Sequence, residues 1–306
     1  MKPSFLLLFV LLAASFLTQA QDSTATKTKT ATVFLKDGTQ LRGSLISESA
    51  DLIRIRTDNL GELSISLDKI EKIERYTAGY YKNGHFWPEN PHSTRYFWAP
   101  SALPLRKGEA YYQNAYIFVN SVSVGVTDQF TMGGGFVLNP TFRDWQVLFI
   151  TPKISFPSQG NVTFGAGVIA VGVFNRQYTY DYQNPYSSRS SRIKTNLAGI
   201  AYGNVTFGDV ERNTSLGLGW AFANDEFSAR PVLNVSHMKR IGKKTGFVTE
   251  NWIIVPGGGD SALALLSGGV RIFGERTSVD LALWVPAGVG SFVVIPYVDF
   301  VLKFGK

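Results

Sequence analysis

The last strand-like segment of the chain, residues 291–304 (SFVVIPYVDFVLKF), separates its side chains by polarity. Alternate positions from Phe292 to Phe304 are all apolar, whereas Tyr297, Asp299 and Lys303 lie between them. Because successive side chains of a strand point to opposite faces, one face of this segment is wholly apolar and the other carries charge. A chain that repeats this pattern without helices to cover the apolar faces needs lipid around it. The pattern therefore predicts an outer-membrane β-barrel.

Similar segments recur from about residue 94 to the end of the chain. Most of them have the ~9–11 residues, or more, that a tilted strand needs to cross a bilayer. Short and longer connections alternate between them, and outer-membrane barrels keep their short turns in the periplasm. An even count of about twelve strands then leaves both ends of the barrel in the periplasm. The expected strands are 94–99, 110–126, 129–139, 145–156, 161–174, 194–207, 214–223, 230–241, 246–255, 261–273, 276–285 and 291–304.

The residues before the barrel divide into four segments. Residues 1–20 combine Lys2, an apolar run and a small-residue end at Ala20, which is typical of a secretory signal peptide. The polar tract 21–30 is expected to be disordered because it has too little apolar surface to bury. Residues 31–75 predict a small sheet of about five short strands, 76–92 a linker, and 93–306 the barrel.

The small N-terminal domain carries the run LKDGTQLRGSL at residues 35–45. This run resembles that of SH3-like or Sm-like small β-barrels, and the resemblance implies such a fold for residues 31–75. Its loops, Asp37-Gly38 and 58–61, carry acids where RNA-binding Sm-like barrels carry basic and aromatic residues. The overall fold class is thus all-β: an antiparallel transmembrane barrel preceded by a small SH3/Sm-like domain. The barrel is expected in the outer membrane and the small domain in the periplasm.

Charged residues inside the barrel segments are expected to face the lumen. On the lipid face near the midplane, an Arg or Lys costs roughly 2–4 kcal/mol. Two roles are open for such a set: an ion-pair network that fills a narrow barrel, or a lining that selects solutes. The residues with this expected orientation are Lys153, Glu250, Arg271, Asp280, Asp299 and Lys303.

Catalytic and metal chemistry find little support in local spacing. The chain has no cysteine, which excludes disulfides, thiolate metal sites and a lipoprotein anchor. His237 is the one strand histidine, and its neighbour Ser236 points to the opposite face, so no lipase-like triad forms locally. We therefore predict no catalytic residue, no metal, no cofactor and no enzyme. The net charge of +7 is not gathered into a basic stripe, which argues against nucleic acid.

A resemblance covers most of residues 94–304. Residues 90–114 (NPHSTRYFWAPSALPLRKGEAYYQN), 123–130 (SVGVTDQF) and 247–252 (FVTENW) look like the corresponding parts of outer-membrane β-barrel proteins of Bacteroidota. The resemblance implies an envelope location. It brings no substrate and no catalytic residues.

Two functions follow as hypotheses. The first is a small pore or structural envelope component, porin-like in architecture, whose periplasmic domain gates it or docks to a partner. The second is surface binding or adhesion through a Tyr-rich outer loop. An outer-membrane lipase is a third, weaker reading. The expected partners are outer-membrane lipid, the barrel-assembly machinery and a periplasmic partner of the small domain. The loop residues proposed to bind are Tyr178, Tyr180, Tyr182 and Tyr186.

Overall fold

The computed structural model describes most of the chain in two compact units. The described residues are 30–57, 59–76, 79–82, 85–139, 145–158, 160–179, 190–254, 263–288, 290 and 292–305. The units are Met1–Trp87 and Pro88–Lys306, and each is described by itself. The predicted signal peptide and nearly all of the polar tract lie outside the described residues. Among the described residues, no helix is long and apolar enough to cross a membrane.

The N-terminal unit contains a five-stranded antiparallel sheet in the order β4-β3-β2-β1-β5. Its core is apolar: Val33, Ile53, Ile55 and Ile65 are buried together. Five strands are present in the region where about five were predicted, and the SH3/Sm-like class remains a prediction. The elements are β1 (Thr30–Leu35), β2 (Gln40–Glu48), β3 (Leu52–Thr57), β4 (Gly61–Ser66), the 3-10 turn η1 (Leu67–Lys69) and β5 (Ile70–Tyr76). A two-stranded sheet follows, made of β6 (Gly79–Lys82) and β7 (His85–Pro88).

Two hairpin turns of this sheet use the chemistry that the sequence indicates. Gly38 and Gly61 both have a positive φ, of 86° and 70°, a conformation that glycine adopts without a steric penalty. At the first turn, the Asp37 Oδ1 accepts a hydrogen bond from the Thr39 backbone N–H at 2.9 Å. Side-chain bonds of this kind favour turns over continued strands.

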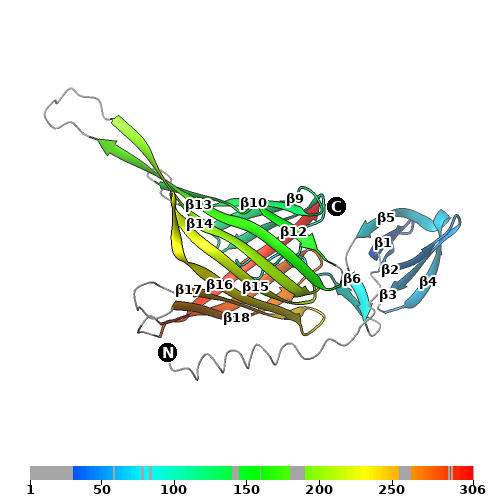
Figure 1. The fold of residues 1–306 in the computed structure, drawn as a ribbon. Coiled ribbons are helices and arrows are strands. Elements are labelled where there is room, and N and C mark those ends of the chain that lie inside the picture. The colour runs from blue at the N-terminus through cyan, green and yellow to red at the C-terminus, as the bar shows by residue number, and fades with distance from the viewer. Residues whose placement is uncertain are drawn as a thin grey trace, which may run out of the picture. The chain divides into compact units, whose positions relative to one another are not determined.

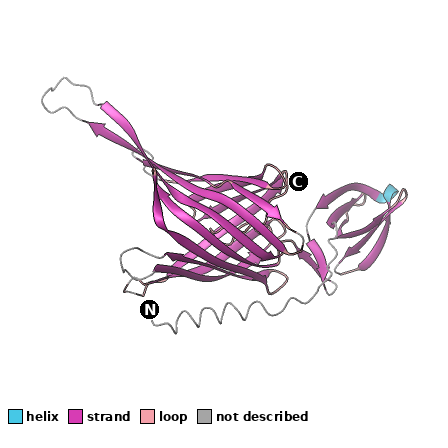
Figure 2. Ribbon diagram, viewed as in Figure 1, coloured by secondary structure: helices cyan, strands magenta, loops and turns pink. Residues whose placement is uncertain are grey.

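The second unit is a closed antiparallel barrel (Figures 1 and 2). The sheet runs from β10 through β20 to β8 and β9, and β9 pairs with β10 to close it. β11 and β12 both pair with β10 and β13, so they are two halves of one wall strand, and the barrel has twelve strands. The elements are β8 (Glu109–Ala115), β9 (Val119–Gly125), β10 (Phe130–Val137), β11 (Trp145–Ile150), β12 (Lys153–Pro157), β13 (Val162–Thr179), β14 (Ser190–Gly208), β15 (Arg212–Ala223), β16 (Glu226–Arg240), β17 (Thr245–Ile254), β18 (Leu263–Phe273), β19 (Thr277–Ala287) and β20 (Ile295–Gly305).

The predicted count of twelve is right, but two of its strands are wrong. Residues 94–99 form no wall strand, and the predicted strand 110–126 is two strands, β8 and β9. The break between them contains Tyr116 and Ile117 at φ 52° and 70°, where the sequence offers no glycine, proline or asparagine. The Asn114 Nδ2 donates to the Ile117 carbonyl at 3.0 Å and helps to hold this turn. One strand lost and one gained leave the count unchanged.

The outer surface of the barrel is an apolar belt. Outward side chains such as Phe164, Leu216, Leu283 and Phe300 are each 39–54% exposed, although they are large and hydrophobic. A soluble monomer rarely leaves so much contiguous apolar surface in water, whereas lipid chains cover it without penalty. The alternation seen in the sequence therefore places this belt around the whole wall.

Candidate functional site: a segment of chain inside the barrel

The interior of the barrel is occupied by part of its own chain. We call residues 89–106 the luminal segment. Apart from a single bridge between Arg95 and Pro100, it has no regular structure. Its tip is a tight turn in which the Tyr96 N–H donates to the Ala99 carbonyl at 2.9 Å. Phe97, Ala99 and Ala102 are fully buried, so this stretch packs within the lumen.

The carboxylate of Glu250, in the middle of β17, binds the tip of the luminal segment. Its Oε2 accepts hydrogen bonds from three successive backbone N–H groups, those of Phe97, Trp98 and Ala99, each at 2.8 Å. Its Oε1 accepts one from the Trp252 indole at 2.7 Å. The residue has no exposed surface. Four donors on one buried carboxylate satisfy groups that would otherwise be left without partners.

The wall around Glu250 is irregular in a way that supports this contact. Between Val248 and Trp252, the ladder of β17 with β18 is interrupted, and side chains of these strands complete it. The Glu250 N–H donates to Ser267 Oγ at 2.9 Å, and the Ser267 N–H donates to Asn251 Oδ1 at 3.1 Å. Asn251 is buried in this seam, where backbone groups satisfy its amide. The seam fixes the position from which Glu250 reaches inward.

A second contact joins the luminal segment to β18 and β19 through Arg271. The guanidinium makes two 2.7 Å bonds to the two oxygens of Asp280, a bidentate pair between register partners. It also donates to the carbonyls of His92 and Tyr96, both at 2.6 Å. Both charged residues are fully buried. Arg271 therefore neutralises a wall carboxylate and holds the backbone of the luminal segment at the same time.

Two more cations join the segment to the wall, Lys153 from β12 and Arg95 from the segment itself. Lys153 donates to the carbonyls of Ser101 and Leu103 at 2.8 and 2.7 Å. Arg95, from the segment itself, donates to Thr151 Oγ1 at 2.7 Å and to the Tyr111 hydroxyl at 2.9 Å. Among the described luminal residues, three buried or half-buried cations thus accompany three buried carboxylates: Lys153, Arg95 and Arg271 with Glu250, Asp280 and Asp299.

Two ion-pair groups lie at the end of the barrel that carries its two chain ends. Lys303, the sixth predicted inward charge, is near Glu109 at 3.1 Å and Glu89 at 3.9 Å and is partly exposed. Arg240 pairs with Glu211 at 2.8 Å and also donates to the Pro88 carbonyl. Burial raises the pKa of the Glu211 carboxyl, and the charge of Arg240 opposes that rise. These pairs fasten the start of the luminal segment.

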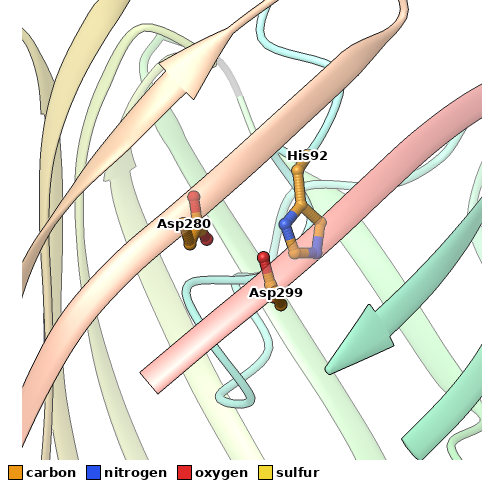
Figure 3. Close-up of side chains that lie close together, drawn as sticks. All are labelled: His92, Asp280 and Asp299. Atoms are coloured by element: carbon orange, nitrogen blue, oxygen red, sulfur yellow. The ribbon is translucent and has the colours of Figure 1, made fainter. Parts of the chain in front are cut away.

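One cluster contains groups that could hold a cation. His92, Asp280 and Asp299 place a ligand atom each within 4.8 Å of one another, and Figure 3 shows a ring nitrogen of His92 facing the two carboxylates. Within the described part of the chain, both His92 ring nitrogens and Asp299 Oδ1 have no hydrogen-bond partner. Arg271 already occupies both oxygens of Asp280 and repels a second cation. Because the three cations of the lumen already balance its three carboxylates, a neutral imidazole fits best here. That the chain binds no metal remains a prediction.

Glycines in the wall leave room for the luminal segment. A Cβ on Gly125 would lie 2.1 Å from the Arg106 carbonyl oxygen, and one on Gly165 would lie 3.1 Å from Ala102. Any side chain at Gly125 would displace backbone. Such positions in strands often mark a close approach of another chain segment.

The structure brings all six predicted inward charges into contact with, or close to, the luminal segment, of which the sequence interpretation had placed residues 94–99 in the wall. Interpretation of residues 94–99 as a strand therefore missed His92, Arg95 and the amides of the tip as functional groups. The available signal was proline: Pro91, Pro100 and Pro104 lie in or beside this stretch and disfavour a central strand. Of the predicted loop residues, Tyr178 lies in β13, and Tyr180, Tyr182 and Tyr186 lie outside the described residues.

No protein-family model matches the sequence, and the search of curated proteins gave no match. Among solved structures, the chain is similar to a loop L8 deletion mutant of OmpT, an outer membrane protein of Vibrio cholerae, at 11% identity and a TM-score of 0.36. That match covers 91% of this chain and 97% of the other. The CymD monoaromatic hydrocarbon channel matches at 11% identity and a TM-score of 0.36, over 66% of this chain and 90% of the other. The toluene transporter TbuX of Ralstonia pickettii matches at 10% identity and a TM-score of 0.25, over the same shares.

The closed wall and its apolar belt decide the class. The chain is an outer-membrane β-barrel protein. Similarities at such low identity and TM-score carry no argument about what it binds.

The prediction that the chain is not an enzyme is wrong as it stands. The similar structures include OmpT proteins of Vibrio cholerae as well as a channel. The prediction also rested on sequence neighbours, whereas a barrel brings distant strands together. Ser236, for example, donates to Asn234 Oδ1 at 2.9 Å inside the lumen, and His237 bonds with Thr214 on the other face.

Proposed function

We propose that this protein is a structural component of the outer membrane, a barrel that its own luminal segment keeps closed. The single observation that carries the proposal is the set of buried contacts from Glu250, Arg271 and Lys153 to the backbone of that segment. They come from separate parts of the wall and converge on one stretch of chain. A lining that selected solutes would leave its charges accessible to water. Here the charged side chains bond the backbone of the luminal segment instead.

Conductance tests the closed barrel directly. Purified native protein in planar lipid bilayers is expected to give no stepwise current, because the luminal segment fills the polar part of the lumen. An open porin of similar size, reconstituted in the same bilayers, serves as the positive control. Heat-modifiable gel migration verifies that the reconstituted protein is folded. Stable single-channel currents from the folded native protein would contradict the proposal.

The N-terminal unit is proposed to lie in the periplasm as an SH3/Sm-like docking module. The support is topological. The barrel has an even number of strands, and its ends lie on the side of the short turns, such as 126–129 and 274–276. Protease added to intact cells should therefore leave residues 31–75 uncut and should cleave them once the outer membrane is permeabilised. Cleavage of residues 31–75 on intact cells would show the opposite orientation, with the N-terminal unit outside the cell. A Bacteroidota source for the chain rests on the resemblance alone.

Surface binding is the second candidate, and one observation favours it. β13 and β14, of 18 and 19 residues, are the longest described strands and form a ribbon that extends beyond the rest of the wall (Figure 1). Its described tip carries Arg176, Arg192 and Lys194, all exposed. Deleting residues 180–189 should abolish adhesion of cells to glycan-coated surfaces while barrel assembly stays normal. Unchanged adhesion would exclude a binding role for Tyr180, Tyr182 and Tyr186.

A further inference from the structure

The inward face of the barrel changes from polar to apolar at one level. On β13 and β14, Thr163, Asn204 and Thr206 face the lumen near the short-turn end, and Ile169 and Ile200 face it further out. Ile169 and Ile200 are direct register partners. The residues that face the lumen of a closed barrel need not be polar where no water-filled path exists. Here their polarity changes sharply along the barrel axis, which divides the lumen into a polar chamber near the short turns and an apolar chamber further out.

The same change occurs on the other strands. Glu250 gives way to Trp252 on β17, Ser267 to Leu265 on β18, and Thr151 to Phe149 where β12 meets β11. The apolar positions are also neighbours across the ladders, so they form a continuous surface. The pairs that connect it are Val171 with Phe149, Val173 with Val147, Val147 with Val137, Val137 with Val119, and Trp252 with Leu265.

The luminal segment fills the polar chamber and covers only one side of the apolar one. The ring of Phe97, in the luminal segment, packs on the rings of Trp284 and Tyr297, at centroid distances of 5.8 and 5.1 Å. Trp284 and Tyr297 are both buried. The other inward apolar side chains keep part of their surface exposed: Trp252 and Leu265 beside the Phe97 cluster, and Phe149, Ile169, Val171 and Ile200 on β11, β13 and β14. We call these six residues the apolar vestibule.

The vestibule has a floor and a rim. A narrow cleft of about 10 Å³ lies between Pro100 of the luminal segment and Ile200, Gly219, Val232 and Trp252 of the wall. It is too small for more than a water-sized group, so any ligand lies above it. Two residues beyond Val232, Arg230 begins a polar rim. No charged side chain is found among the vestibule residues themselves.

We propose that the apolar vestibule binds a small, uncharged, apolar molecule. A charged ligand would lose its hydration there without an opposite charge to pair with, whereas an apolar one gains by the area that it removes from water. The ring systems of Phe149 and Trp252 favour a flat, aromatic ligand through offset or edge-to-face contacts. This inference goes beyond the proposed structural role, and it holds or fails independently of conductance.

The test uses fluorobenzene and full-length protein in lipid nanodiscs. Fluorine NMR line broadening separates saturable binding to the protein from partition into lipid, which empty nanodiscs measure. The native protein should show a saturable component, and 4-fluorobenzoate should show none. The double variant Ile169→Ser/Ile200→Ser changes two facing inward residues and should weaken binding about tenfold or more, from the apolar area lost.

The matched control changes the next register pair, which faces lipid. Val168 and Ala201 are direct partners on the outer face, so Val168→Ser/Ala201→Ser adds the same two hydroxyls outside the lumen. Its binding should stay within about twofold of native. If the inward double variant does not fold, Val171→Ser replaces it. A lack of saturable binding to the native protein would overturn the proposal. Equal effects of the inward and outward pairs would overturn it as well.

Discussion

Replacing Arg271 with methionine should lower the free energy of unfolding of the barrel by about 3–5 kcal/mol, the range for a buried ion pair that loses one partner. The guanidinium is fully buried and bonds both oxygens of Asp280 and the carbonyls of His92 and Tyr96. Methionine fills a similar volume and supplies no donor. Asp280 would then be a buried carboxylate without a counter-charge.

Guanidinium titration of the protein in phospholipid vesicles, followed by tryptophan fluorescence, measures this loss. Arg230→Met is the matched control, because Arg230 is exposed at the rim and its removal should change stability by less than about 0.5 kcal/mol. Adding Asp280→Leu to Arg271→Met should restore part of the stability, since an apolar pair can replace a buried ion pair. Restoration should be incomplete because the carbonyls of His92 and Tyr96 would still lack the donor that Arg271 supplies. A loss below about 1 kcal/mol for Arg271→Met would refute a central role for this contact.

The sequence predicts the orientation of these charges better than their partners. Alternation along β18 and β19 places Arg271 and Asp280 opposite their apolar neighbours, and strands that face lipid must follow this rule. Their pairing depends on the register of the hairpin, and the structure places its turn at residues 274–276. A turn centred at Gly274-Glu275 alone gives a register two residues away, in which Arg271 meets Ser278. Orientation is a local property, whereas pairing requires the turn to be placed to the residue.

The luminal segment could not be found from alternation because burial inside a barrel resembles burial in its wall. Tyr96, Phe97 and Trp98 are as apolar as a wall strand, and the N–H groups of Phe97 and Trp98 bond a distant carboxylate, Glu250, instead of a neighbouring strand. The sequence offers no local signal for a partner about 150 residues away. The turn at Tyr116 and Ile117 was missed for a related reason. Its positive φ values are stabilised by contacts such as the bond from the Tyr116 hydroxyl to the Pro296 carbonyl at 2.9 Å.

The apolar vestibule also needed the structure. Its residues alternate correctly in the sequence, but apolar side chains on both faces of the outer strand halves remove the contrast that marks a lumen. Only the register, which joins Ile169 to Ile200 and Phe149 to Val171, makes the inner apolar residues one surface. A chain whose lumen is polar in one half and apolar in the other cannot be assigned to a water-filled pore from its charges alone.

Replacing Glu250 with alanine should release the tip of the luminal segment and turn a silent barrel into a conducting one. The change leaves the N–H groups of Phe97, Trp98 and Ala99, and the Trp252 indole, without their shared acceptor. Each buried donor left unpaired costs about 1–3 kcal/mol. The segment can avoid that cost by leaving the lumen, because water outside the lumen satisfies its amides. Stepwise currents in planar bilayers, absent from native protein, are the expected result.

Two further variants separate release of the segment from general loss of stability. Glu250→Gln keeps an acceptor oxygen but adds an amide N–H₂ without an evident acceptor, so it should conduct less often than Glu250→Ala. Glu226→Ala removes an exposed carboxylate at the start of β16 and should stay silent. Heat-modifiable migration of all three variants verifies that the wall is closed. If Glu250→Ala is folded, silent and as stable as native protein, then the carboxylate does not hold the segment, and closure depends on Arg271 and Lys153 instead.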